Sequence, residues 1–368
     1  MSSAGSEDGA DLIVVGAGLA GLTATAALAD QGAQVLVLAD VRRGEASPAA
    51  AGVLAPSVAP LPGPARAFAL AARDYYPDYL AALQERTGVA VPLDRRGILE
   101  VAADERHAAA LRGAVGAGSS WVDRGALRTL EPDLAHAAGA LVHHADGAVD
   151  NLALLRALHR LLARHPRVRM VHAAAGRVTL RAGGAAVETR GGVVYSGERL
   201  VLAAGAWAPQ LAGLPRALPV APVRGQMMAV AFDGLRHVVF GGGGYAVPRA
   251  NGRTLVGATS EQAGFDPSHT ESGLAALRAI ATAVAPRLGR SRTLGVWAGL
   301  RPMTPDLLPI LGPDPEWPAL LYSCGHSRNG VLLAPLTGAC LAAIALGGPP
   351  PLDITPFGVE RFAEQQTD

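Results

Sequence analysis

The stretch DLIVVGAGLAG at positions 11–21 decides the fold of this chain. Its apolar first half is rich in β-branched residues and predicts a buried parallel strand. The second half places Gly16, Gly18 and Gly21 at the spacing G-x-G-x-x-G. The alanine-rich segment 22–29 then predicts a helix, whose first turn, with Leu19 and Ala20 beside it, offers free N–H groups to phosphate. The stretch therefore predicts a strand–turn–helix unit that binds a dinucleotide.

A second strand is predicted over 34–38, and it ends at Asp40. A carboxylate at this place can accept a hydrogen bond from a ribose hydroxyl, which favours an unphosphorylated dinucleotide such as FAD or NAD. The next segment, RRGEASPAAAGVLAP over 42–56, consists largely of small residues, so its backbone can lie close to a flat ligand. We therefore expect Ala50, Ala51 and Gly52 to face the cofactor.

The overall composition excludes several classes of function. A formal net charge of +1 over 368 residues gives no basis for binding nucleic acid or an anionic membrane. The cysteines Cys324 and Cys340 form no CxxC pair, and the adjacent His143 and His144 would face opposite sides of a strand, so no metal site is predicted. No segment is apolar enough to span a bilayer, and residues 1–10 are expected to form a disordered tail without the pattern of a signal peptide. A cytoplasmic location is expected.

The remaining chain alternates between helical and strand patterns. Helices are predicted over 66–87, 104–117, 151–164, 272–285 and 331–346. Short strands over 168–173, 176–181 and 185–190 predict a meander, and Asn251-Gly252 predicts the turn of a hairpin between 245–249 and 254–258. The apolar strand 199–207 runs into Ala204, Gly205 and Trp207, where the backbone can again meet a cofactor.

Six motifs, read together, match a known family in order along the chain. They are DLIVVGAGLAGL (11–22), GEASPAAAGVLAP (44–56), LVLAAGAWAP (200–209), YAVPRANGRTLVGAT (245–259), WAGLRPMTPD (297–306) and GHSRNGVLLAPLTG (325–338). On these residues the chain resembles the flavin-dependent D-amino-acid oxidase superfamily, and within it the glycine oxidase (ThiO-type) branch. The resemblance extends from residue 11 to about residue 340.

The resemblance implies an α/β fold in which a Rossmann-type FAD-binding domain is interleaved with an antiparallel-sheet substrate domain. The expected boundaries are 1–82, 148–221 and 294–368 for the FAD-binding domain, and 83–147 and 222–293 for the substrate-binding domain. FAD is expected to bind non-covalently, and NAD is disfavoured because the AAGAW strand and the RNG loop have no evident task around nicotinamide. The residues expected at the cofactor are Gly16, Gly18, Leu19, Ala20, Gly21, Asp40, Ala50, Ala51, Gly52, Val178, Ala204, Gly205, Trp207, Gly325, Asn329, Gly330, Val331 and Leu332.

The resemblance also implies which residues meet the substrate. Arg301 is expected to pair with the substrate carboxylate, because a planar guanidinium binds a carboxylate through two parallel hydrogen bonds. Tyr245 falls at a tyrosine that donates to the same carboxylate, and Arg328 lies in the RNG loop near the active site. A surface ion pair for Arg301 and an ordinary strand tyrosine for Tyr245 are the alternatives. His326 is expected to be structural, because an oriented neutral amine passes its hydride to flavin N5 without a general base.

The sequence departs from the family around the substrate. Smaller residues stand at Gly243, Gly244, Ser260, Ser327 and Val53, whereas Met303 is larger than the usual glycine. The added space favours a bulky N-substituted glycine, such as an N-carboxymethyl amino acid, which is oxidised to glyoxylate and an amine while O2 becomes hydrogen peroxide.

Three alternatives to this substrate prediction stay open. The first is a free-glycine oxidase that supplies iminoglycine for thiamine thiazole synthesis. The others are a flavin dehydrogenase with another electron acceptor, and an inert flavin-binding subunit, against which Arg301 and Tyr245 argue. An amino acid substrate and O2 are thus the expected partners, and the family resemblance is compatible with a homo-oligomer.

Overall fold

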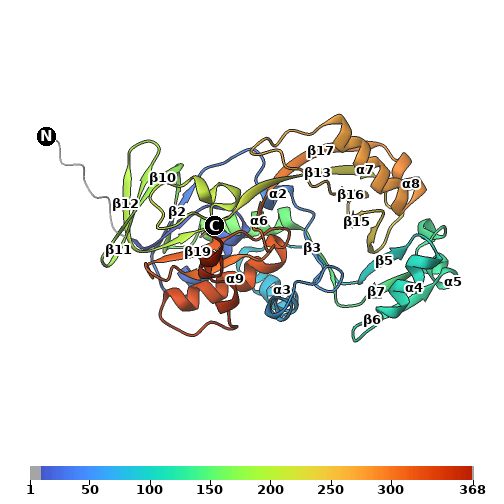
Figure 1. Cartoon of the computed structure of the whole chain (residues 1–368), viewed down its shortest axis with the longest axis horizontal. Helices are drawn as coiled ribbons and strands as arrows, with labels where there is room; N and C mark the ends of the chain where they lie inside the picture. Colours follow the sequence, from blue (N-terminus) through green and yellow to red (C-terminus); the bar gives the residue numbers. More distant parts are fainter. Residues whose placement is uncertain (1–9, 367–368) are drawn as a thin grey trace.

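The computed structural model describes residues 10–366, which form two large sheets and a small third sheet (Figure 1). The first large sheet is organised around β1 (Ala10–Val15), which pairs in parallel with β2 and β12. Its other strands are β2 (Val35–Ala39), β9 (Val168–His172), β10 (Ala175–Arg181), β11 (Gly184–Thr189), β12 (Val194–Leu202), β18 (Ile310–Pro313) and β19 (Leu320–Cys324). The strand–turn–helix prediction is confirmed, with the buried pattern of β1 extending through Val15.

Helices from distant parts of the chain pack against this sheet. They are α1 (Leu19–Asp30), α3 (Pro64–Thr87), α6 (Asn151–Leu162) and α9 (Gly330–Ala345). The α1–α9 contact is close because Thr23 Oγ1 donates 2.8 Å hydrogen bonds to the carbonyls of Leu19 and Ala334. Gly338 permits this approach, since a Cβ there would lie 2.7 Å from the Thr23 backbone. The two ends of the sequence are therefore held together in one core.

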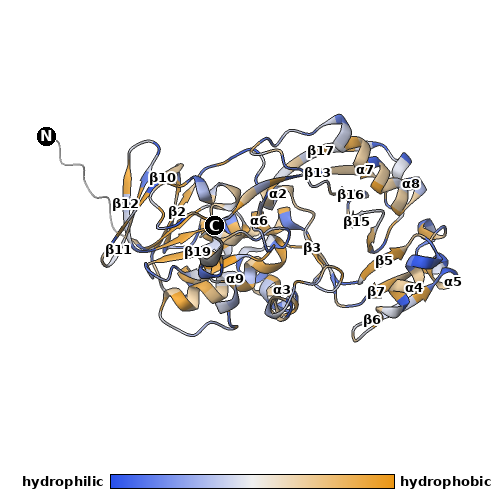
Figure 2. Cartoon of the chain, viewed as in Figure 1, coloured by the Kyte–Doolittle hydropathy of each residue, from blue (hydrophilic) through white to orange (hydrophobic). Residues whose placement is uncertain are grey.

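The second large sheet has the order β17-β13-β16-β15-β14-β5-β7-β6. Its strands are β5 (Ile98–Ala102), β6 (Ser119–Asp123), β7 (Gly139–His143), β13 (Ala221–Ala231), β14 (Val238–Gly241), β15 (Gly244–Arg249), β16 (Arg253–Gly257) and β17 (Thr293–Met303). Alternate residues face opposite sides: Met228 and Val230 pack against α7 (Glu271–Val284), whereas Met227 belongs to the cluster on the other face. Figure 2 shows hydrophobic residues along the strands of both sheets.

Short elements complete the arrangement. The third sheet has the order β3-β8-β4, and the short helices lie between or beside the strands. These elements are β3 (Val53–Leu54), β4 (Leu93–Asp94), β8 (Gly147–Val149), α2 (Ala46–Ala49), α4 (Glu105–Gly113), α5 (Arg124–Leu130) and α8 (Pro286–Arg290), with 3-10 turns at Pro132–Leu134, Gly205–Gln210, Thr355–Phe357 and Val359–Gln366. No helix within residues 10–366 is long and apolar enough to cross a membrane.

The fold class is confirmed, but several local predictions are wrong. The segment 168–173 is not part of the meander: β9 pairs in parallel with β2, and only β10, β11 and β12 form the antiparallel run. A half-exposed edge strand has the same residue pattern in either setting, so periodicity does not reveal its partner. The helix predicted over 104–117 ends at Gly113, and β6, α5 and β14 were not predicted.

The structure bears on two further expectations. Ala10, which was placed in a disordered tail, begins β1, and the rest of that tail lies outside the described residues. β17 joins the second sheet, although most of its residues fall in a segment assigned to the FAD-binding domain. The domain boundaries themselves stay a prediction.

Candidate active site between the two sheets

The glycine motif forms the tight turn that the spacing predicts. Gly16 has φ +113°, and a Cβ there would overlap the carbonyl of Ala203. A Cβ at Gly21 would overlap the carbonyl of Gly16, so this glycine serves helix–strand packing. The first helical N–H, that of Leu19, donates a 2.9 Å hydrogen bond to Ser47 Oγ. The positive end of α1 is thus placed at a surface free of bulky side chains.

This surface is one wall of a cavity of about 830 Å³ that lies between the two large sheets. Most of the residues expected at the cofactor line it. These are Gly16, Gly18, Leu19, Ala20, Asp40, Ala50, Ala51, Gly52, Ala204, Gly205, Trp207, Asn329, Gly330 and Val331. Four widely separated segments of the chain therefore meet at one site, although direct contact with a cofactor stays a prediction.

Val178 does not belong to this group. Its side chain is buried in the core of the first sheet, and its N–H donates to the carbonyl of Ala212 at 2.7 Å. Ala173 and Ala175 line the cavity instead, because the start of β10 rather than its middle reaches the site. Val178 therefore does not line the cavity, and its contact with a cofactor stays a prediction.

Four other predicted residues lie behind the cavity wall. Gly21 packs against the glycine turn, Leu332 belongs to the hydrophobic core, and a Cβ at Gly325 would lie 2.6 Å from Thr304. Met303 stands at the end of β17, paired with Ala221, and does not line the cavity. Its bulk therefore has no direct effect on the size of the site.

The cavity wall has unsatisfied polar atoms that fit a bound flavin dinucleotide. Ser323 Oγ and His326 Nε2 are buried without a hydrogen-bond partner among residues 10–366, and both residues line the cavity. Burial lowers the pKa of His326 to about 4, so its imidazole is neutral near pH 7. Asn329, which precedes the first residue of α9, makes no side-chain cap, and this leaves the first N–H groups of the helix free for a ligand. Neither cysteine lines the cavity, in keeping with non-covalent binding.

Arg301 is held on the opposite wall by the second sheet. Its Nη1 donates a 3.0 Å hydrogen bond to the carbonyl of Thr259. The guanidinium lies over the backbone of β13, where a Cβ at Gly225 would overlap it. Among the described residues no carboxylate pairs with Arg301, so the alternative of a structural ion pair is not observed. Burial lowers its pKa and the neighbouring Tyr245 opposes this change.

Tyr245 lies on β15 and faces the same cavity as Arg301. Its hydroxyl donates to Met227 Sδ at 3.6 Å. Burial raises the pKa of Tyr245, and the positive charges of Arg301 and Arg328 oppose this rise. The phenol therefore keeps its proton near pH 7 and can donate a hydrogen bond to an anion.

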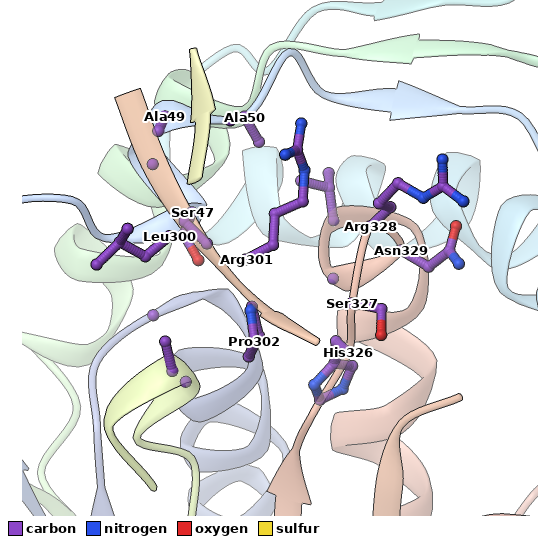
Figure 3. A pocket seen from close by; sticks show the side chains of 18 of the residues that line it. Ser47, Ala49, Ala50, Leu300, Arg301, Pro302, His326, Ser327, Arg328 and Asn329 are labelled. Atoms are coloured by element: carbon purple, nitrogen blue, oxygen red, sulfur yellow. The ribbon is translucent and has the colours of Figure 1, made fainter. Parts of the chain in front are cut away.

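Arg328 supplies a second cation. Its side chain is exposed toward the cavity and forms no ion pair with any described carboxylate. Figure 3 shows Arg301 and Arg328 extending to the same side, whereas the His326 ring lies on the other side. Two unpaired guanidinium groups beside one hydroxyl donor make this part of the cavity a site for anions.

The small residues expected around the substrate lie in this cavity. Gly243, Gly244, Ser260, Ser327 and Val53 all line it. Their contact with a substrate stays a prediction.

Sequence reasoning missed several residues that build the site. Ser47 of α2, which accepts from the first N–H of α1, Thr259 behind Arg301, and Gly225 below it are set by tertiary contacts. Phe240 and Glu100 also line the cavity. The alternation of residues along a strand would have predicted that Phe240 and Glu100 face the cavity only if the order of the strands had been known.

The comparison with protein families decides the assignment. The model of the DAO family, described as FAD dependent oxidoreductase, matches residues 11–344. The chain belongs to this family. It is therefore an FAD-dependent oxidoreductase.

Relatives within the family narrow the resemblance to glycine oxidases. The chain is 33% identical to a glycine oxidase of Geobacillus kaustophilus, covering 95% of this chain and 97% of that protein. It is 36% identical to a bifunctional ThiO/ThiG protein of Synechocystis sp., covering 96% of this chain but 54% of the relative. The chain thus spans about half the length of that bifunctional protein.

Solved structures agree with this assignment. The crystal structure of the Geobacillus kaustophilus glycine oxidase matches with a TM-score of 0.88 at 32% identity, covering 96% of this chain and 99% of that one. An iminodiacetate oxidase from Chelativorans sp. BNC1 also gives 0.88, covering 95% and 98%, but at 24% identity it supports the fold alone. The family member described here therefore shares the glycine oxidase fold along nearly its whole length.

Proposed function

We propose that this oxidoreductase oxidises the glycine unit of a bulky N-substituted glycine, such as an N-carboxymethyl amino acid. The observation that carries the proposal is the pair Arg301 and Arg328, two cations on one cavity without a carboxylate partner among residues 10–366. A substrate with two carboxylates satisfies both, whereas free glycine has only one carboxylate to offer.

The protein groups bind and orient this substrate. Arg301 and the Tyr245 hydroxyl hold the carboxylate of the glycine unit, and Arg328 receives the carboxylate of the N-substituent. Gly243 and Ser327 leave room for the substituent because they add little volume to the wall. Fixed orientation of the methylene group provides most of the rate in such a reaction.

The chemistry balances with O2 as the final oxidant. When bound, FAD would supply the oxidation by accepting the hydride of the glycine methylene and returning the electron pair to O2, which with the proton released from the substrate nitrogen would become hydrogen peroxide. The substrate loses the hydride and its N–H proton to become an imine. Water then adds to the imine carbon and the C–N bond breaks, which releases glyoxylate and the free amine.

A peroxide-coupled assay on the purified yellow protein tests the proposal. The substrates are glycine, sarcosine and N-carboxymethyl derivatives of longer amino acids, compared by kcat/KM. We expect the N-carboxymethyl compounds to be preferred, and Arg328→Gln to reduce that preference while leaving the rate on sarcosine within about threefold.

Other outcomes would replace the proposal with an alternative. Preference for glycine over every N-substituted compound would favour a free-glycine oxidase of the kind that the glycine oxidase relatives represent. Flavin reduction by substrate without peroxide under air would favour a dehydrogenase. The proposal also includes a cytoplasmic location, where the two free and buried cysteines stay reduced. Light scattering tests whether the enzyme is a homo-oligomer.

A further inference from the structure

One row of side chains crosses the whole second sheet on its cavity side. Register pairs join Trp297 to Met227, then Gly257, Tyr245, Phe240 and Glu100 in turn, from β17 to β5. Residues paired in register point to the same face of a sheet. Met227, Tyr245, Phe240 and Glu100 accordingly all line the one cavity.

Glu100 is the only charged member of this row. The ring of Phe240 lies between it and the substrate site, with its centroid 5.5 Å from that of Tyr245. Beyond Glu100 the row continues with Leu141 and Trp121, which cluster with residues of α4. The row therefore presents the aromatic rings of Tyr245 and Phe240, followed by the carboxylate of Glu100.

The Glu100 carboxylate has one oxygen engaged and one available. Oε2 lies 3.1 Å from His143 Nε2, and no described residue bonds to Oε1. The Glu100 side chain is 29% exposed, whereas His143 is buried at 8%. The open side of this carboxylate faces the cavity, where His107 of α4 also lines the wall.

The spacing of the strands sets the length of a ligand that would reach it. Glu100 lies two strands from Tyr245, a separation of about 10 Å at 4.7–4.9 Å per strand. An extended chain of about six to nine bonds covers roughly 7–10 Å.

We propose that Glu100 binds the cationic end of the N-substituent, so that the preferred substrates are N-carboxymethyl amino acids whose side chain carries a terminal amine or guanidine. This inference rests on the proposed oxidation of N-substituted glycines and names their class. The alkyl part lies over Phe240, and the terminal cation pairs with Glu100 Oε1. A carboxylate in an otherwise uncharged row selects the N-substituent by the charge of its end as well as by its length.

Three glycines with chains of similar length and different ends test the proposal. They are Nα-carboxymethyl-lysine, N-carboxymethyl-2-aminoheptanoic acid and N-carboxymethyl-2-aminopimelic acid, which all keep the second carboxylate for Arg328 and are assayed for peroxide with the FAD-loaded enzyme. We expect the amine to exceed the alkyl compound in kcat/KM by about fivefold, the upper range for a partly exposed ion pair, and the carboxylate to be the poorest.

Glu100→Gln keeps the shape of the side chain and an acceptor for His143. In this variant the three compounds should become equal within about twofold, through KM rather than kcat, while the rate on glycine stays unchanged. Glu100→Lys should reverse the order in favour of the carboxylate. Asp306→Asn is the matched control, because it removes another carboxylate that lines the cavity but pairs with Arg361 and lies outside the row.

The outcomes separate this inference from the function on which it rests. An amine preference that survives in Glu100→Gln, or equal rates on all three compounds in the wild type, would overturn the role of Glu100 and leave the oxidation of N-substituted glycines standing. Oxidation of glycine with no turnover of any N-alkylated glycine would overturn both. Melting temperatures within about 2 °C of the wild type show that the variants fold.

Discussion

The two walls of the cavity recognise their ligands by different means. The wall from the first sheet is made mainly of glycine, alanine and helix N-termini, so it offers backbone N–H groups and close approach. The wall from the second sheet carries Arg301, Tyr245, Phe240 and Glu100, so it offers side chains. Backbone recognition needs particular residues at fixed spacing, whereas side-chain recognition needs only that paired strands bring the right groups together.

The largest expected effect comes from a substitution at Gly16, in the cavity wall formed by the first sheet. In Gly16→Ala the new Cβ overlaps the carbonyl of Ala203, and the backbone must keep φ +113°. We expect FAD affinity to fall by more than about a hundredfold, since strain and overlap both oppose the bound turn. Flavin absorbance per protein measures this loss.

Gly295→Ala is the control for this substitution, because Gly295 has no neighbouring atom within 4 Å of an added Cβ. This variant should keep its flavin. Full flavin occupancy in Gly16→Ala would show that the first wall does not depend on close backbone approach.

Substitution of Arg301, in the cavity wall formed by the second sheet, should leave the cofactor bound. Arg301→Lys keeps the charge but loses the planar fork, so kcat/KM should fall by about a hundredfold, and Arg301→Met by about a thousandfold. Steady-state kinetics and flavin content are measured on the same samples. Loss of flavin in parallel with activity would contradict the division between the two walls.

Gly225, a glycine in the wall formed by the second sheet, provides a finer test of the difference between the two walls. In Gly225→Ala the added Cβ overlaps the Arg301 guanidinium and displaces it, so KM should rise by about tenfold with flavin content unchanged. The combination of Gly225→Ala with Arg301→Met tests the cause, because Gly225 acts only through that guanidinium. The double variant should be no worse than Arg301→Met alone, and additive losses would assign Gly225 another role.

The smallest expected effect is on stability, and it concerns the side chain of His326 in the wall formed by the first sheet. The folded pKa of His326 is lowered from 6.5 to about 4 by burial, so between these values the unfolded chain binds more protons than the folded one. Stability is therefore lost as the pH falls below 6.5, by about 1 kcal/mol between pH 7 and pH 5.5 from this group.

Chemical denaturation of the wild type and His326→Gln at the two pH values measures this contribution. The difference between the proteins should shrink as the pH falls. An unchanged difference would mean that His326 is not held neutral by burial.

The sequence was informative where recognition is local. The spacing of Gly16, Gly18 and Gly21 predicted the turn, in which Gly21 packs on the carbonyl of Gly16 five residues before it. Asp40 was placed at the cavity by its position directly after the second strand. Val178 does not line the cavity, because which end of a strand reaches a cavity depends on the neighbouring strands. Gly225 and Glu100 were missed because strand pairing with distant segments gives them their surroundings.

The sequence by itself determined the dinucleotide turn, the alternation of helices and strands, and membership of a flavin-dependent family, because these depend on residue types at short and regular spacing. Only the tertiary structure decided that β9 lies beside β2, that Arg301 and Arg328 have no carboxylate partner among residues 10–366, and that Glu100 lies in register two strands from Tyr245. Those facts depend on strand order and packing, which bring together residues more than a hundred positions apart in the chain.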